Sequence, residues 1–296
     1  MFQREFMEYH SDRFEDFSLM VFKNEKLVAV LPANRKGNKL FSHQGLSYGG
    51  LVFQEKLKFK EVLLVFQSVL KHLNDSKIKE IRIKLLPSIY GVIPNDELQY
   101  LAFLLDAKLS RRDALAVVNM NAGIKYSKDR IEGSKRGIKN NLVIKEVEDF
   151  VEFWNTILIP NLSNKHNTNP VHSLAEITML KSKFPKNIRQ FNVYKNKEIV
   201  AGTTIFETKN VAHSQYISGN ENKNSLGSLD FLHTNLLDEI FVNKNYFDFG
   251  ISNENKGRNV NQGLQYWKEG FGARTIVQDF YTFETNSYTK LNKVML

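Results

Sequence analysis

An internal repeat constrains the fold of this chain more than any other feature of its sequence. Residues 21–29 match residues 193–201 with five identities, and both segments read as an apolar stretch, a polar Lys-Asn pair and a second apolar stretch. This pattern is typical of a β-hairpin. A second pair of segments, residues 41–49 and 211–219, lies at nearly the same offset and shares a His and a Gly: His43 with His213, and Gly49 with Gly219. Two matches in register indicate two halves of similar plan.

The segments after each hairpin keep the same order in both halves. A Gly-containing loop leads to a helix with apolar periodicity, at residues 57–73 and 228–242, and then to a strand, at residues 78–85 and 246–250. The length of 296 residues also suits two domains of ~150 residues each. We therefore expect a mixed α/β (α+β) fold with an N-terminal domain at residues 1–120 and a C-terminal domain at 121–296. Each should hold a mixed sheet flanked by helices, and the second should carry the active site.

Periodicity, capping residues and helix breakers predict the remaining elements. Ser173, followed by Glu176, has the spacing of a capping box that begins a helix. The full set is a helix at 97–107, a strand at 114–120, a basic helix at 127–141 interrupted by Gly133 and Gly137, a helix at 148–158 ended by Pro160, helices at 173–184 and 261–269, and a strand at 275–283.

The composition excludes several kinds of chemistry. The chain has no cysteine, which rules out a disulfide scaffold, a cysteine nucleophile and thiolate metal sites. His166 and His172, separated by Pro170, have a poor spacing for metal ligands, so we predict no metal site. No apolar run approaches the ~18 residues of a membrane span, and the first residues are charged where a signal peptide is apolar. These features predict a cytoplasmic protein without a transmembrane segment.

Basic residues are concentrated in one segment. The net charge is +9, and residues 125–145 contain seven basic and two acidic residues, a net of +5. If Ile131, Ile138 and Leu142 form the packing stripe of the predicted helix, then Arg136 and Lys139 lie on its outer face, where they can bind phosphates. A solvated surface is the alternative. The segment lacks interleaved aromatic residues, so base stacking is not predicted.

Polar side chains interrupt two strands of the second half. Strand alternation places His213 and Gln215 on one face, and Ser214 and Tyr216 on the other. His213 is either a general base or a hydrogen-bonded core histidine. Asp248 lies at the carboxyl end of its strand, where it either binds an amine or caps a turn.

Several motifs together resemble the FemAB-like branch of the GNAT acyltransferases. They are residues 169–173, 183–188, 194–202, 246–252 and 261–273, and the resemblance covers most of residues 125–285. It implies tandem GNAT-like domains and transfer of an acyl or aminoacyl group to an amine on a sugar- or peptide-containing cell-envelope precursor. The donor is either an acyl-coenzyme A, such as acetyl-coenzyme A, or an aminoacyl-tRNA. GNAT enzymes that bind coenzyme A usually carry the phosphate-binding motif Arg/Gln-x-x-Gly-x-Gly/Ala. Residues 224–229 match this motif only at the central Gly227.

The resemblance, together with the residues themselves, defines a candidate site. His213 is expected to take or relay a proton, and Asp248 to orient the amine or the histidine. A small-molecule donor and an amine acceptor, at least one of them carrying phosphate, would contact a further set of residues. That set is Arg136, Lys139, His172, Ser173, Gln215, Tyr216, Gly227, Ser252, Glu254, Asn261 and Lys268. The alternative function is a non-catalytic module that binds anions or nucleic acid and keeps the duplicated fold.

Overall fold

The computed structural model describes residues 2–295 and divides into two compact units. The N-terminal unit comprises residues 1–113 and 277–296, and the C-terminal unit comprises residues 114–276. This division differs from the expected boundary near residue 120, because the last twenty residues pack with the first unit. Phe283 and Leu291 are buried in the N-terminal hydrophobic core.

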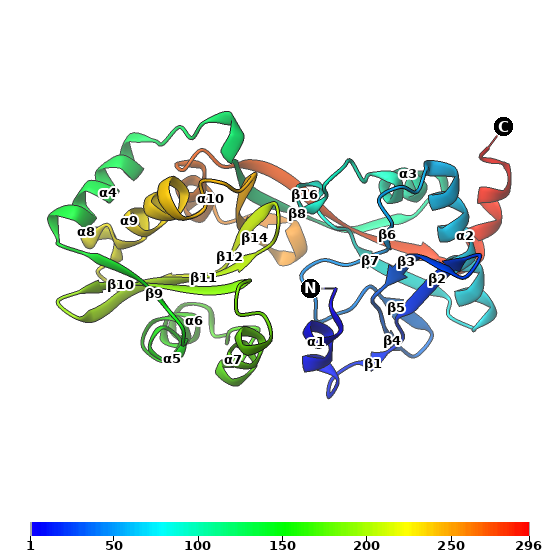
Figure 1. Cartoon of the computed structure of the whole chain (residues 1–296), viewed down its shortest axis with the longest axis horizontal. Helices are drawn as coiled ribbons and strands as arrows, with labels where there is room; N and C mark the ends of the chain where they lie inside the picture. Colours follow the sequence, from blue (N-terminus) through cyan, green and yellow to red (C-terminus); the bar gives the residue numbers. More distant parts are fainter. Residues whose placement is uncertain (1, 296) are drawn as a thin grey trace. The chain divides into compact units, whose positions relative to one another are not determined.

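The N-terminal unit combines two sheets with two principal helices (Figure 1). One sheet has the order β1 (Glu15–Asp16), β4 (Asn34–Lys36), β5 (Lys39–Phe41), β7 (Glu80–Lys84), β16 (Arg274–Glu284) and β8 (Lys108–Asn119), and the other contains β2 (Leu19–Lys23), β3 (Lys26–Leu31) and β6 (Val52–Phe53). A short helix, α1 (Arg4–Met7), precedes them, and α3 spans Glu97–Leu104. Helix α2 (Phe59–Asp75) buries the apolar stripe that the sequence predicts, including Val62, Phe66, Val69 and Leu73.

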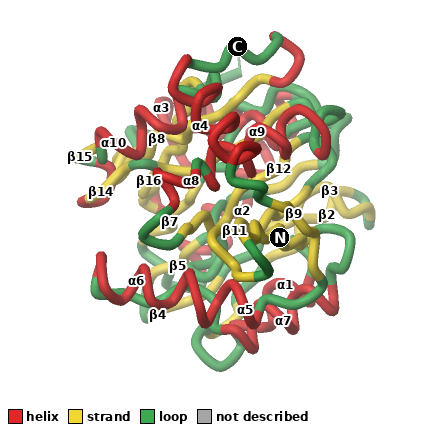
Figure 2. The backbone as a smooth tube through the Cα atoms, turned by 90° about the vertical axis from the view of Figure 1, so that its left-hand side faces the viewer, coloured by secondary structure: helices red, strands yellow, loops and turns green. Residues whose placement is uncertain are grey.

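The C-terminal unit is a three-layer α/β structure. Its strands have the order β8, β13 (Tyr246–Ile251), β12 (Val211–Gly219), β11 (Glu198–Glu207), β10 (Ile188–Lys195) and β9 (Val143–Val147). Figure 2 shows these strands between two groups of helices. One group is α4 (Lys128–Lys139), α8 (Lys223–Leu226) and α9 (Ser228–Asn235), and the other is α5 (Val151–Phe153), α6 (Ile159–His166) and α7 (Leu174–Lys183). A small hairpin of β14 (Asn253–Glu254) and β15 (Asn259–Val260) precedes α10 (Gln262–Glu269). The predicted mixed α/β architecture is confirmed.

The repeated hairpins agree down to a local irregularity. The strand pairs β2–β3 and β10–β11 both turn through two residues with positive φ, Asn24-Glu25 and Asn196-Lys197. Both pairs also shift register at one place, directly after Val21 in the first and after Val193 in the second. Because a bulge is a specific feature of a hairpin, its recurrence at matching positions confirms the structural repeat.

The last strand of each half pairs in the other unit. Strand β8 ends the first half and pairs antiparallel with β13, whereas β16 ends the second half and pairs antiparallel with β7. This exchange explains why the C-terminal residues belong to the N-terminal unit. Pairing across such sequence distances leaves no local signal in the sequence.

Helix α4 packs through glycines rather than through the predicted apolar stripe. Ile131 and Ile138 are 43% and 64% exposed, whereas Gly133 and Gly137 are buried. A Cβ added at Gly133 would overlap Asp230, and one added at Gly137 would overlap Phe231, both on α9. The prediction of an Ile131–Ile138 stripe is therefore wrong, and the glycines do not interrupt the helix. They allow close approach of two helix backbones.

Two further helices differ from their predicted form. Pro160 does not end the helix predicted at 148–158, because the helical backbone continues through it into α6. A π-helical turn at Trp154–Leu158 joins α5 to α6. A second π-helical turn, Leu236–Ile240, follows α9 and leaves Ile240 40% exposed. The capping box of Ser173 and Glu176 is present as predicted.

No helix within the described residues is both long and apolar enough to cross a membrane.

Candidate active site

The strands β12 and β13 separate at the center of the C-terminal unit. They run parallel and pair at only three positions, Val211 with Tyr246, Ala212 with Phe247 and His213 with Asp248. Beyond that point β12 continues to Gly219 and β13 to Ile251 without pairing to each other. His213 and Asp248 therefore occupy the last paired position before the sheet opens.

His213 and Asp248 form a partly buried hydrogen-bonded pair. His213 Nδ1 lies 2.9 Å from Asp248 Oδ2, and the two side chains are 16% and 2% exposed. The other carboxylate oxygen, Oδ1, accepts a hydrogen bond of 2.7 Å from the Gly250 backbone N–H. When Nδ1 donates to Asp248, the second ring nitrogen, Nε2, carries the lone pair that can accept a proton.

The turn beneath this pair requires a glycine. Gly250 has φ of +69°, and a Cβ at this residue would lie 3.3 Å from His213 Cε1. Lys268 on α10 donates hydrogen bonds to the carbonyls of Gly250 (3.1 Å) and Ile251 (2.7 Å). Burial lowers the pKa of Lys268 to about 8, although the negative charge of Asp248 opposes that shift. The ammonium of Lys268 thus holds the 250–251 backbone and is not positioned to neutralise a ligand phosphate.

A bulge in β12 changes which side chains share a face with His213. In the pairing with β11, Phe206 lies opposite His213, Ile205 opposite Ser214 and Thr204 opposite Tyr216, which leaves Gln215 without a partner residue. Since Phe206 and Thr204 point to the same side of β11, His213 and Tyr216 also share a face. The predicted alternation, with Tyr216 on the opposite face, is wrong for this reason.

Tyr216 ties a loop histidine to the same face. The His172 backbone N–H donates to the Tyr216 hydroxyl (3.0 Å), and His172 Nδ1 lies 2.7 Å from the same oxygen. Burial raises the pKa of Tyr216 to about 12. Next to His172, Ser173 caps α7 by accepting a hydrogen bond from the Glu176 N–H (3.2 Å). These residues fix the start of α7 beside the strand.

A groove of about 700 Å³ lies past the opening of the strands. It begins on β12 at Ile217, four residues or about 13 Å beyond His213. Its basic lining residues are Arg130 and Arg136 from α4 and Lys223 from α8. Of the predicted binding residues, Arg136 and Asn261 line the groove. Those outside its lining are Lys139, His172, Ser173, Gln215, Tyr216, Gly227, Ser252, Glu254 and Lys268.

The predicted binding residues at positions 252–261 differ in their hydrogen bonding. Asn261 and Glu254 bond to other residues of the protein, whereas Ser252 does not use its hydroxyl. Asn261 caps α10 by accepting a hydrogen bond from the Leu264 N–H (3.0 Å), and its amide donates to the exposed Glu254 (3.3 Å). Ser252 is buried, and its Oγ has no hydrogen-bond partner among the described residues. The Gln215 Oε1 atom is likewise buried without a partner. Neither oxygen is therefore satisfied by the described residues of the C-terminal unit.

Among the groove residues that the sequence did not predict are Arg130, Asp230 and Trp267. Asp230 Oδ1 accepts hydrogen bonds from Arg130 Nη1 (2.5 Å) and Trp267 Nε1 (2.8 Å), which connects α4, α9 and α10. Burial raises the pKa of Asp230 even though Arg130 opposes the shift. In the sequence, Asp230 resembles an ordinary acidic residue in the first turn of a helix, so only a helix–helix contact could have identified it.

The start of α9 does not offer the open phosphate site that coenzyme A requires. Gly227 and Ser228, which precede and begin the helix, are buried. A Cβ at Gly227 would overlap the carbonyl oxygen of Gly133, so the backbone of α4 covers this turn. The Asp230 carboxylate adds negative charge in the same helical turn. The residues present therefore do not fit a pyrophosphate bound at this helix N-terminus.

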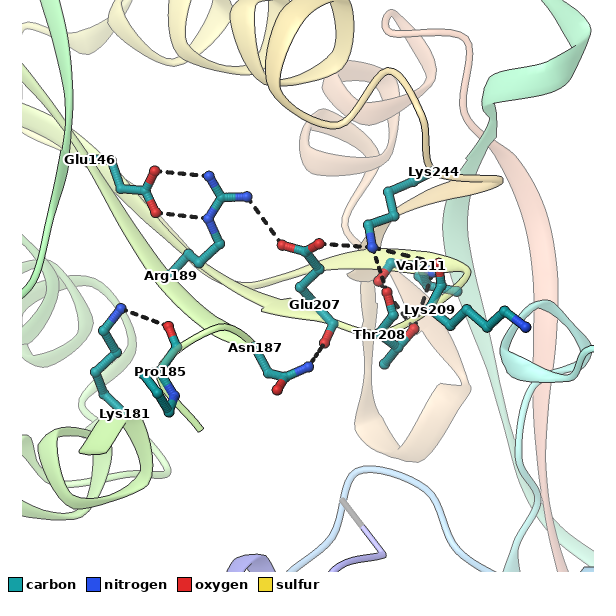
Figure 3. Close-up of polar contacts among 10 residues, drawn as sticks. All are labelled: Glu146, Lys181, Pro185, Asn187, Arg189, Glu207, Thr208, Lys209, Val211 and Lys244. Carbon is teal, nitrogen blue, oxygen red and sulfur yellow. Dashed lines mark hydrogen bonds and ion pairs between the residues drawn. The ribbon is translucent and has the colours of Figure 1, made fainter. Parts of the chain in front are cut away.

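An ion-pair network fixes the sheet at the start of β12 (Figure 3). Arg189 forms two hydrogen bonds to Glu146 on β9 (2.7 and 2.8 Å) and one to Glu207 at the end of β11 (3.1 Å). Lys244, in the loop before β13, pairs with Glu207 (2.8 Å) and donates to the Thr208 carbonyl (2.7 Å). The network joins three strands to that loop and so holds in place the ends from which β12 and β13 begin.

The described residues of the N-terminal unit place no histidine–carboxylate pair at the position equivalent to His213 and Asp248. Phe41 on β5 pairs with Arg82 on β7, as Val211 pairs with Tyr246, so His43 and Lys84 occupy the places of His213 and Asp248. Burial lowers the pKa of His43 to about 4 and that of Lys84 to about 8. A protonated lysine cannot accept a hydrogen bond from an imidazole, so Lys84 cannot orient His43 as Asp248 orients His213.

Among the residues whose side chains the structure describes, no group of three or more His, Asp or Glu is arranged to hold a metal ion.

No protein-family model and no curated protein sequence matches this chain. Solved structures match over nearly its whole length. FemX has a TM-score of 0.64 at 11% identity, with 98% of this chain and 93% of FemX covered. The C-terminal domain of a protein named as a lysylphosphatidylglycerol synthetase, from Agrobacterium fabrum, has a TM-score of 0.61 at 12% identity. The match covers 93% of this chain and 87% of that domain. L-PGS from Bacillus licheniformis has a TM-score of 0.59 at 12% identity, with 96% of this chain and 92% of L-PGS covered. The chain therefore shares the fold of FemX, the Agrobacterium domain and L-PGS.

Proposed function

We propose that this protein is an acyltransferase that joins an acyl or aminoacyl group to an amine on a sugar- or peptide-containing cell-envelope precursor. The observation that carries the proposal is the His213–Asp248 pair, placed where β12 and β13 separate. A carboxylate-bound histidine at an opening of the sheet has the arrangement that a general base needs. The similarity of the fold to FemX and to the lysylphosphatidylglycerol synthetase domain also supports transfer of an acyl or aminoacyl group.

The reaction forms one bond and breaks another. The acceptor amine attacks the acyl carbonyl carbon, a C–N bond forms, and the bond from that carbon to the donor's leaving oxygen or sulfur breaks. His213 Nε2 accepts the proton that the amine loses and returns it to the leaving group. Asp248 stabilises the imidazolium in between. Peptide N–H groups of β12 beyond His213 have no β13 partner, so they can donate to the carbonyl oxygen as negative charge develops.

The groove supplies a binding site for an anionic donor. Arg136 and Lys223 line it, and Arg130 is held there by Asp230. Because the start of α9 is covered, the geometry favours an aminoacyl-tRNA over an acyl-coenzyme A, whose pyrophosphate would need that helix end. The product named for the Agrobacterium neighbour, a lysyl ester of a phospholipid, is consistent with an aminoacyl donor.

A donor comparison tests this proposal. Purified protein is incubated with acetyl-coenzyme A or with a set of charged tRNAs, each in the presence of peptide- and amino-sugar-containing nucleotide precursors, and amide products are measured. We expect turnover with charged tRNA and much less with acetyl-coenzyme A. Turnover with acetyl-coenzyme A alone would contradict the donor assignment.

The non-catalytic alternative has one observation in its favour. Lys128, Lys135 and Lys139 are exposed on α4, outside the groove. Salt-dependent binding of RNA that carries no amino acid, together with no product from any donor, would favour a non-catalytic nucleic-acid-binding module over an enzyme.

A further inference from the structure

The N-terminal unit contains its own cavity, of about 290 Å³, which the proposed reaction does not use. Its lining starts at Gly49, the repeat partner of Gly219 in the C-terminal groove. It also includes Leu98 and Gln99 in the first turn of α3, just as Gly263 and Leu264 line the groove from the first turn of α10. The duplication has thus kept a cavity at the corresponding place in each unit.

The walls of the N-terminal cavity are apolar. Leu51, Val62, Leu85 and Leu98 are buried and line it. Near its mouth, Val92 and Ile93 are 63% and 47% exposed. Apolar walls that continue into exposed apolar side chains are suited to a ligand with a hydrocarbon part.

Three of the polar side chains that line this cavity offer hydrogen-bond acceptors without partners among the described residues. Glu55 and Glu97 both line it, and neither carboxylate has a hydrogen bond or ion pair among the described residues. Asn95 Oδ1 is buried, also without a partner. The lining contains no Lys or Arg side chain, in contrast to the three cations of the C-terminal groove. The two cavities therefore have opposite charge preferences.

We propose that the N-terminal cavity binds a primary amine that carries an apolar chain. The ammonium donates hydrogen bonds to the Glu97 carboxylate, and the chain lies against the leucine and valine walls. A carboxylate or phosphate ligand is disfavoured, because it would bring a second negative charge beside Glu55 and Glu97. This site is independent of the reaction proposed for the C-terminal unit.

Calorimetric titration of the full chain at pH 7 with n-octylamine, n-octanoate and n-octanol tests the proposal. Octylamine, protonated at this pH, should bind about tenfold more tightly than octanoate, with octanol in between. Glu97→Gln should weaken octylamine binding about fivefold and leave octanol binding unchanged. Glu25→Gln removes the same charge from an exposed turn of this unit and should change neither affinity.

A blocking variant locates the binding. Gln99 is exposed at the cavity, so Gln99→Trp should fill the opening without disturbing the core, and circular dichroism checks that the variant is folded. Octylamine binding should be lost in Gln99→Trp. Three results would overturn the proposal: no octylamine binding at millimolar concentration, equal affinity for octylamine and octanoate, or octylamine binding that survives in folded Gln99→Trp.

Discussion

His213 and Asp248 face each other across the last paired position of β12 and β13, with Nδ1 and Oδ2 2.9 Å apart. Strand pairing fixes the two backbones, and the Gly250 N–H fixes the carboxylate. The pair is thus positioned by the sheet itself and does not depend on a mobile loop. A site built in this way is expected to be sensitive to changes in the turn at residues 249–251.

Gly250→Ala tests that sensitivity. Alanine at φ of +69° costs about 1 kcal/mol of stability, and its Cβ would lie 3.3 Å from the His213 ring. We expect kcat to fall by at least about tenfold. Gly37→Ala is the matched control, because φ is +61° and no atom lies within 4 Å of the added Cβ. It should lose similar stability and keep full kcat. An equal loss of kcat in both variants would show that strain alone accounts for the effect.

Gly137→Ala tests the contact between α4 and α9. In an exposed helix this substitution stabilises by about 1 kcal/mol, since alanine is the better helix former. Here the Cβ would overlap Phe231, so we expect destabilisation of about 1–3 kcal/mol, measured by urea unfolding. Glu132→Ala, at an exposed position of the same helix, should have little effect. A more stable Gly137→Ala protein would contradict the close packing.

The pH dependence of stability tests the burial of His233. This side chain is fully buried, and burial lowers its pKa to about 4, from 6.5. Between these values the unfolded chain binds a proton that the folded protein does not, so stability falls as the pH decreases from 6.5 towards 4. From pH 7 to pH 5 the His233 contribution is about 2 kcal/mol. His233→Leu should reduce the acid-induced loss by that amount. An unchanged slope would show that His233 is accessible to protons.

Arg136 and Lys139 separate groove contacts from surface charge. Both are exposed basic residues on α4, but Arg136 lines the groove and Lys139 does not. Arg136→Ala should weaken donor binding about tenfold, the value of one charge-assisted contact. Lys139→Ala should change it less than twofold. If the two variants weaken binding equally, the donor follows the outer face of α4 instead of the groove.

The sequence predicts the local elements well and the tertiary features poorly. The hairpins, the stripe of α2 and the Ser173 cap depend on residues near one another in the chain, so their patterns are visible. The bulge at Gln215 depends on the partner strand, and the exchange of β8 and β16 depends on pairing across the whole chain. Neither leaves a pattern within one segment.

The dependence on distant parts of the chain also explains which site residues were predicted wrongly. His213 and Asp248 can be chosen from the sequence because polar residues on buried strands are unusual. Lys268 resembles a surface lysine until its burial against two carbonyls is known. Gly133 and Gly137 resemble helix breakers, because the sequence does not reveal that α9 approaches them. Residues whose role depends on a neighbouring element are therefore the ones that prediction missed.

The most direct test of the central claim is the single-turnover rate of the His213→Ala and Asp248→Asn variants, measured with donor and acceptor bound at saturation. If His213 accepts the amine proton and Asp248 orients it, both variants should be folded and bind the donor normally. Their chemical step should then be slower by about 10²–10⁴-fold. Wild-type single-turnover rates in both variants would contradict the assignment of the active site to this pair.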